Sequence, residues 1–301
     1  MKKYRLINVL LVLLVYATSC NTNSSKSVDL KFKLPKGSKY EYSATTAMDM
    51  KQSENANDSS IRNETAFSYV FEVVNDSANW KTLTSTISRV AMDMNVMGHS
   101  IHVDTDMKLD TATPGPFAMM GKMFGAMKNA KFSFTINEKG EIGQISGIRE
   151  MQEKMLSQLP GAPSGGRMPG MDDENLKQNM QQAFAVYPDK PVKPGDSWTK
   201  TLVQRMQGMT LKTENVFTLE SVKGNDAAIG QETKINSDIT SDSAQGVKIT
   251  GSQKGTLHYN LSTGMITDGD LDMIMEVKNM MMQTEKPRMV NMKVKMKGRE
   301  M

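Results

Sequence analysis

The sequence predicts a mainly β (α+β) protein, in which long antiparallel strands form a curved sheet or open barrel with two or three short helices. The first observation behind this fold class is that apolar and polar residues alternate over most of the chain from Lys31 onward. The second is that clusters of Gly, Asn, Asp and Ser separate the alternating runs, as in an antiparallel meander. The third is the proline-rich stretch 187–198, which holds the backbone extended and opens a new strand at Trp198.

The N-terminus has the pattern of a bacterial lipoprotein. Residues 1–19 combine three basic residues, the apolar run 6–16 and three small residues before Cys20, the only cysteine of the chain. We expect 1–19 to be a signal peptide, Cys20 to carry a lipid that binds the membrane, and 20–27 to be a flexible tether. An ordinary secretory signal with an incidental cysteine is the alternative. Residues 28–301 then form a single β-rich domain, long enough for a sizeable core.

The charge balance argues against a nucleic-acid partner. The chain has 37 basic and 33 acidic residues, and three of the basic ones lie in the leader, which leaves a net charge of +1. Nucleic-acid binding requires a strongly basic face. We interpret the locally basic segment 286–299 as a solvated strand edge guarded by lysines.

In the first half of the chain, alternation predicts strands at 40–50, 67–73, 80–90 and 91–103, with a turn at 75–77. In the middle, apolar residues at helical spacing predict helices at 117–127, 148–159 and 172–187. Residues 131–144 are expected to form a hairpin between the first two helices, and 160–170 a Pro- and Gly-rich loop.

The second half of the chain repeats features of the first. Segment 194–198 is similar to 36–40, and the glycine turn at Gly264 is similar to the one at Gly140. We therefore expect a duplicated meander, with repeats 28–147 and 188–283. Strands at 270–283 and 289–297 complete the predicted sheet.

One segment carries a resemblance to a known family. Residues 188–198 read Pro-Asp-Lys-Pro-Val-Lys-Pro-Gly-Asp-Ser-Trp, and Leu34-Pro35-Lys36-Gly37, 136–142 and 262–266 fall where the same pattern places them. The chain resembles an uncharacterised lipoprotein family of Bacteroidota, domain of unknown function number 6263. The resemblance covers most of the chain after Cys20. It implies a mostly β envelope lipoprotein without assigned catalytic residues. We expect it on the outer membrane, with the inner membrane as the alternative, and the absence of an acidic run after Cys20 favours the periplasmic face.

No catalytic constellation is visible in the sequence, and we expect a non-enzyme without cofactors. Gly195-Asp196-Ser197 is similar to an esterase nucleophile segment, but His258 lacks the aspartate three residues earlier that would complete the base. Acidic residues alternate at Asp268, Asp270 and Asp272, which is typical of a solvated strand face and not of a paired catalytic site. Glycine fingerprints for dinucleotides or phosphates are missing.

Methionine is the unusual component, with 28 residues. Several methionines alternate along predicted strands: Met92, Met94, Met273, Met275, Met292 and Met296, with Val290 and Val294 beside the last two. Flexible thioethers suit a wall that accepts an apolar or lipid ligand, whereas the same face could pack permanently on the helices of a structural or assembly lipoprotein. A third alternative is a soft-metal site for copper or silver, built from Met92, Met94, Met97, His99, His102 and Met107.

Overall fold

The computed structural model describes residues 27–51, 60–96, 99–107, 116–157, 172–206, 209–239, 247–279 and 287–301. In these ranges the chain forms one curved, open antiparallel sheet of 12 strands with three helices, which confirms the predicted fold class. The predicted leader 1–19, Cys20 and the loop 160–170 lie outside the described residues.

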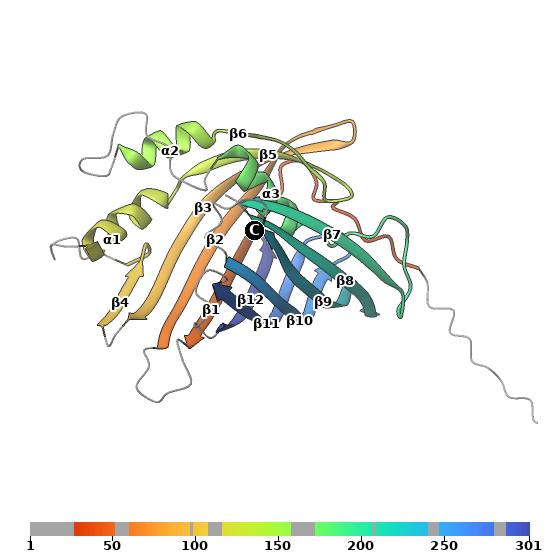
Figure 1. The fold of residues 1–301 in the computed structure, drawn as a ribbon. Coiled ribbons are helices and arrows are strands. Elements are labelled where there is room, and N and C mark those ends of the chain that lie inside the picture. The colour runs from red at the N-terminus through yellow and green to blue at the C-terminus, as the bar shows by residue number, and fades with distance from the viewer. Residues whose placement is uncertain are drawn as a thin grey trace, which may run out of the picture.

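The strands form two groups that meet in the middle of the sheet, and we call them the first and second wings (Figure 1). The first wing consists of β1 (Lys39–Lys51), β2 (Ser60–Ser77), β3 (Trp80–Val96), β4 (His99–Asp104), β5 (Lys131–Asn137) and β6 (Ile142–Ser146). The second wing consists of β7 (Ser197–Met206), β8 (Met209–Lys223), β9 (Asp226–Ile239), β10 (Val247–Asn260), β11 (Ile266–Asn279) and β12 (Arg288–Glu300).

The first and last strands are the centre of the sheet. The strand order is β6-β5-β3-β2-β1-β12-β11-β10-β9-β8-β7, and β4 pairs with β3 off this path. Strands β1 and β12 pair along almost their whole lengths, from Tyr40 opposite Glu300 to Lys51 opposite Met289. The two ends of the path are therefore β6 and β7, which come from the middle of the chain.

Several predicted strand boundaries were wrong, including the start of the second strand, which is Ser60 and not residue 67. The strands predicted at 80–90 and 91–103 are one continuous strand to Val96, because no turn residue interrupts the alternation, and the chain folds back only into β4. The turn predicted at 75–77 lies one step later, at Ala78, which has a positive φ of 54°. Strand β11 begins at Ile266, earlier than the predicted residue 270, because Ile266 pairs with Tyr259.

The lysines of the basic segment 286–299 predict an edge strand, and this prediction is wrong. Its described part forms β12, between β1 and β11. Its lysines alternate on the outer face and meet acidic residues of β11: Lys293 Nζ lies 3.0 Å from Asp272 Oδ1, and Lys297 pairs with Asp268. These exposed ion pairs contribute little stability, but they confirm the prediction that the aspartates of β11 lie on a solvated face.

The three helices of the described ranges confirm the predicted helical segments. Helix α1 (Pro116–Met127) packs on β3 and β4, α2 (Ile148–Leu156) on α1 and β5, and α3 (Asp173–Ala183) on β6. Helix α3 begins where the Asp172 side chain accepts a hydrogen bond from Asn175 N at 2.9 Å. It ends before the predicted residue 187, because Phe184 and the following residues turn into the core.

One end of the sheet is closed by two segments outside the named strands, 28–34 and 184–192, and we call it the closed end. The segments pair with each other through Val28 and Val192, with N–O distances of 2.8 and 3.0 Å. The first segment also lies between two hairpin turns, since Phe32 N donates to Glu138 O at 2.9 Å and Lys33 N to Thr263 O at 2.8 Å. The most deeply buried side chains gather here: Leu30, Phe32, Leu34, Tyr40, Val73, Phe134, Ile136, Tyr187, Leu219 and Ile229.

Glycines allow the strong curvature of the second wing. A Cβ added at Gly255 of β10 would lie 2.0 Å from Asp270 O of β11, and one at Gly298 of β12 would lie 2.1 Å from Ile266 O. Neighbouring backbones approach so closely at these positions that only glycine fits. The sheet therefore bends around its inner, core-facing side, which we call the concave face.

Candidate ligand-binding face

The methionines predicted to share strand faces lie together on the concave face. Met48 of β1 is directly opposite Met292 of β12, and Met292 is opposite Met273 of β11. In the next row, Met50 and Met275 flank Val290 from both sides. We call this surface the methionine wall and define it as Met48, Met50, Met92, Met94, Met273, Met275, Val290 and Met292. It extends over the centre of the sheet, and Met92 and Met94 on β3 are separated from the other members by Thr65 and Asn63 of β2.

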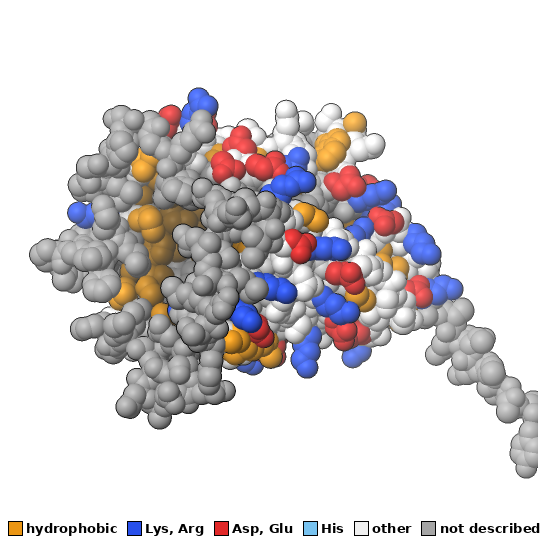
Figure 2. Space-filling model, in the orientation of Figure 1, with side chains coloured by type: hydrophobic (Ala, Val, Ile, Leu, Met, Phe, Trp, Pro, Cys, Tyr) orange, Lys and Arg blue, Asp and Glu red, His pale blue; other side chains and the backbone are white. Residues whose placement is uncertain are grey.

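Burial decreases along the strands from the closed end to the methionine wall. At the closed end, Tyr40, Val73 and Leu219 are each 1% exposed. Six of the eight members of the wall are only half-buried, and the exceptions are Met92 and Val290. Figure 2 shows hydrophobic side chains gathered in a hollow at the left of the view, where Figure 1 places β2, β3 and β4. The concave face thus has a packed end and an end with accessible apolar surface.

Aromatic rings line the concave face of β2 between these two regions. The rings of Phe67 and Tyr69 are stacked at 6.2 Å, and those of Tyr69 and Phe71 at 6.1 Å. Burial raises the pKa of Tyr42 and Tyr69 above the ordinary value of a phenol, so that both side chains stay neutral. This part of the face is apolar and uncharged.

The second wing presents amides and hydroxyls on the same concave face. Thr233 Oγ1 donates to Asn215 Oδ1 at 2.8 Å, and Gln231 Nε2 lies 3.0 Å from Thr233 Oγ1. Asn215 and Thr233 are buried, and Thr233 is opposite Gln253, which is itself opposite Met273 of the wall. We call Asn215, Gln231, Thr233 and Gln253 the polar track. The sequence carried a signal for it, since these residues occupy core-facing positions in strands that alternate, but sequence reasoning missed it.

Helix α3 lies against both ends of the strand path. On the β6 side, the Gln181 side chain accepts from Ile142 N at 2.9 Å and donates to Gly140 O at 3.2 Å. On the β7 side, Asn179 Oδ1 accepts from Gln204 Nε2 at 3.2 Å. Side-chain hydrogen bonds from one polar helix therefore link the two edges of the open sheet.

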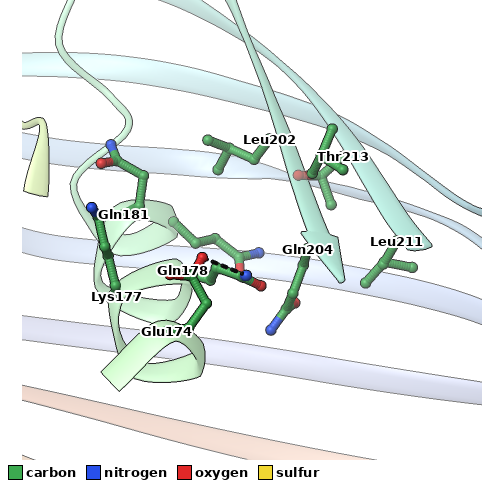
Figure 3. Close-up of a pocket in the computed structure, with 10 residues that line it drawn as sticks. Glu174, Lys177, Gln178, Gln181, Leu202, Gln204, Leu211 and Thr213 are labelled. Atoms are coloured by element: carbon green, nitrogen blue, oxygen red, sulfur yellow. Dashed lines mark hydrogen bonds between the residues drawn. The ribbon is translucent and has the colours of Figure 1, made fainter. Parts of the chain in front are cut away.

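A cavity of about 130 Å³ lies between α3 and strands β7 and β8 (Figure 3). Its lining residues are Glu174, Lys177, Gln178, Gln181, Gln182, Leu202, Val203, Gln204, Leu211 and Thr213. In Figure 3 the Gln178 amide lies between α3 and Gln204. Gln178 Nε2 donates to Glu174 at 3.1 Å, whereas its buried Oε1 has no hydrogen-bond partner among the described residues. We call this cavity the α3 pocket.

The soft-metal cluster considered from the sequence is divided by the strand register. Met92 and Met94 face the concave side, but His102 is on the outer face, opposite Asp93, with which its Nδ1 makes a hydrogen bond. Of the other members, Met107 is exposed, Met97 lies outside the described residues and the side chain of His99 is not described. The imidazole of His102 therefore does not join the thioethers of Met92 and Met94.

The esterase-like segment forms a turn and a strand start. Lys193 N donates to Asp196 Oδ2 at 2.8 Å, and Ser197 Oγ lies 2.8 Å from Thr218 Oγ1. His258 is on β10, three strands from β7, and its Nδ1 lies 3.0 Å from Asp226 Oδ2. Serine and histidine are not brought together. In the part of the chain that the structure describes, no group of three or more His, Cys, Asp or Glu residues is arranged to hold a metal ion.

The fold and the concave face define a β-sheet protein with a partly accessible apolar interior wall. A model described as a family of unknown function, DUF6263, matches residues 78–266, and the chain belongs to this family. No curated protein matches the chain. Among the helices in the described ranges, none is long and apolar enough to cross a membrane.

Three solved structures show distant likenesses to the chain. One, titled for lipid–protein interactions in lipovitellin, has a TM-score of 0.47 and 13% identity over 89% of this chain, which spans 25% of the length of that one. An outer membrane channel from Pseudomonas putida F1 has a TM-score of 0.27 and 8% identity, over 90% of this chain and 98% of that one. Pseudomonas aeruginosa OccK7 has a TM-score of 0.24 and 5% identity, over 89% and 100%. TM-scores this low do not carry function from these proteins to this chain.

Proposed function

We propose that this protein is a non-catalytic binder of an apolar or lipid ligand, held at the cell envelope by a lipid on Cys20. The observation that supports binding is the methionine wall. Its half-buried side chains form continuous cross-strand rows, such as Met48, Met292 and Met273. Contiguous accessible apolar surface in a soluble fold is typical of ligand or partner sites.

The chemistry of the two ends of the concave face supports the same proposal. The closed end is packed with Phe, Leu, Ile, Val and Tyr, which have few rotamers and form a rigid core. The wall is mostly Met, whose unbranched and polarizable side chain adapts to variable shapes. If the wall served only to pack against other parts of the protein, we would expect it to contain the same residue types as the closed end.

The first experiment is native mass spectrometry on the chain from Ser27, which holds every element and contact described above. We expect co-purified lipid, or a mass shift upon addition of a fatty acid. A clean mass without any shift would contradict the binder and favour a structural or assembly role. A bound copper or silver ion would favour a thioether metal site instead.

The second experiment compares two methionines of one strand. Met292 of β12 lies on the wall, whereas Met289 lies on the outer face of the same strand and is 40% exposed. Met292→Gln removes about 1 kcal/mol of apolar contact, so the affinity for a fatty acid should fall about fivefold. Met289→Gln should leave the affinity unchanged. Equal effects of the two substitutions would place the ligand elsewhere.

Anchoring and location rest on the leader and on the single cysteine. We propose that Cys20 carries the lipid and that the sheet faces the periplasm from the outer membrane. Cys20→Ala should move the protein from the membrane fraction to the soluble fraction. Retention of this variant in the membrane fraction would contradict the anchor but not the ligand site.

A further inference from the structure

We propose that the α3 pocket binds the neutral, hydroxyl-bearing head of an amphiphilic ligand whose apolar chain lies on the methionine wall. This inference rests on the proposed function and names its ligand class, a monoacylglycerol-like lipid. The pocket is the place on the described concave side where a cavity, an unpaired buried acceptor and polar wall residues coincide. Gln178 Oε1 supplies the acceptor, and Gln204 and Thr213 lie across the cavity from α3.

The pocket is polar without a net charge. Among its lining residues, Glu174 and Lys177 are the charged ones and have opposite signs. Nearby on β7, Lys200 Nζ is paired with Asp189 at 2.8 Å. The pocket therefore offers an anionic head group no net attraction, and burial of a charge without such compensation is costly in a partly desolvated site. A hydroxyl brings the donor that Gln178 Oε1 lacks, whereas a carboxylate brings none.

One cross-strand row connects the pocket to the methionine wall. Thr213 of the pocket is opposite Ile235, Ile235 is opposite Gly251, and Gly251 is opposite Met275 of the wall. Adjacent strands are about 4.8 Å apart, so Thr213 and Met275 are separated by roughly 14 Å along the sheet. Gly251 has no side chain of its own, and the Met275 side chain occupies the space beside it, since a Cβ added at Gly251 would lie 3.0 Å from Met275 Cγ. The row between Ile235 and Met275 is therefore lined by apolar atoms. An extended apolar chain can follow the row from a head in the pocket to the wall.

The size of the pocket fits a small head group. Its volume of about 130 Å³ compares with a cavity of about 150 Å³ that accommodates benzene in another protein. A glycerol group has a similar number of heavy atoms. Bulkier head groups would have to displace α3 from the side-chain hydrogen bonds that hold it to β6 and β7.

The test compares two lipids of one chain length on the chain from Ser27. A monoacylglycerol and the corresponding ionised fatty acid are titrated by isothermal calorimetry below their aggregation limits. We expect the monoacylglycerol to bind about tenfold more tightly, the effect of about one additional hydrogen bond in a desolvated site. Equal affinities, or tighter binding of the fatty acid, would overturn the head-group assignment while leaving the apolar site in place.

Two variants locate the head. Gln178→Leu removes the unpaired acceptor and Thr213→Val removes the hydroxyl across the cavity; each should lower monoacylglycerol affinity about fivefold and change fatty-acid affinity less than twofold. Gln144→Leu is the matched control, because Gln144 is exposed on β6 and does not line the pocket. Circular dichroism melting checks that each variant is folded. Equal losses for both lipids in folded variants would overturn the assignment, and absence of binding by both lipids to the unmodified chain would overturn the proposed function with it.

Discussion

The two wings of the sheet begin in the same way. In the first wing, Gly37 has a positive φ of 85° and its N donates to Val73 O at 2.8 Å. In the second wing, Gly195 has a positive φ of 94° and its N donates to Leu219 O at 2.7 Å. Each glycine turn therefore fastens the start of the wing's first strand to the wing's second strand.

Each wing also closes over the segment that leads into the other. A Cβ at Gly140, in the hairpin of the first wing, would lie 2.2 Å from Phe184 O, in the segment that leads from α3 to β7. A Cβ at Gly264, in a hairpin of the second wing, would lie 1.9 Å from Lys31 O, in the segment that leads into β1. This reciprocal packing supports our proposal of a duplicated meander with repeats 28–147 and 188–283.

The wings differ in what lines their concave faces. Aromatic rings such as Phe67 and Tyr69 line β2, and helices α1 and α2 follow strands of the first wing. Amides and hydroxyls such as Asn215 and Thr233 line β8 and β9. The two wings share their backbone arrangement because the glycine turns and close backbone contacts allow few other residues. The side chains on the concave face are under no such restriction and differ between the wings. The proposed head-group site lies in the second wing, whereas the methionine wall spans the centre of the sheet, where the two wings meet.

The largest effect is expected from alanine at the two hairpin glycines. Gly140→Ala and Gly264→Ala each combine a left-handed backbone with a collision against backbone, so each should lower the free energy of unfolding by about 2–5 kcal/mol. Gly37→Ala and Gly195→Ala are matched controls, since both have positive φ but no atom within 4 Å of the added Cβ. These should cost about 1–2 kcal/mol. Urea unfolding measures the stability of all four variants. A hairpin variant that is as stable as its control would contradict the proposed role of close backbone packing.

The next effect should be confined to the first wing. Asp104, at the end of β4, accepts from Arg89 Nε at 3.0 Å and Arg89 Nη2 at 2.7 Å, and also from Asp106 N at 3.0 Å. Asp104→Asn should lower stability by about 2 kcal/mol. Hydrogen exchange should show faster opening of β4 with little change in β8 and β9. Equally faster hydrogen exchange in β8 and β9 would contradict this prediction and show that β4 stabilises both wings.

The same carboxylate predicts an acid dependence. The hydrogen bonds from Arg89 hold the pKa of Asp104 at about 2, below its ordinary value of 3.8. Because the folded pKa is the lower one, the stabilisation is complete above the unfolded value and is lost as pH falls from about 4 to about 2. Unfolding curves over this range should show a component that disappears in Asp104→Asn.

The smallest loss of stability is expected at two residues in corresponding positions, Tyr40 in the first wing and Trp198 in the second. Tyr40 OH donates to Ile266 O at 2.5 Å, and Trp198 Nε1 donates to Val186 O at 2.6 Å. Tyr40→Phe and Trp198→Phe should each cost about 1 kcal/mol for the lost hydrogen bond, with a further packing loss at Trp198. Unfolding midpoints in urea measure both.

Tyr40 and Trp198 differ in how their contribution to stability depends on alkaline pH, because only Tyr40 has a phenol that ionises. Burial raises the pKa of Tyr40 to about 12 from the ordinary value of 10.0. Because the folded pKa is the higher one, this contribution is complete below the unfolded value and is lost as pH rises from about 10 to about 12. Trp198→Phe should retain this loss, whereas Tyr40→Phe should reduce it. An unchanged profile in Tyr40→Phe would mean that other buried tyrosines, such as Tyr187, dominate.

The sequence by itself determined the local elements. Alternation around Tyr40 and Met48, or Met273 and Met275, is sufficient for strands because side-chain direction in a strand depends only on neighbouring residues. Helical spacing around 148–159 and 172–187 likewise predicted α2 and α3. The shared face of the methionines followed from the same periodicity, and the family resemblance carried by 188–198 agrees with the family match.

Only the tertiary structure decided which strands are neighbours. Periodicity does not specify a partner, so the sequence did not show that β1 pairs with β12, and the lysines of β12 were mistaken for an edge. The same register places His102 on the face opposite Met92 and Met94. The α3 pocket depends on residues from α3, β7 and β8 meeting across a curved sheet. The curvature of the sheet and the pairing of distant strands depend on the packing of the whole chain, and a local sequence pattern does not specify that packing.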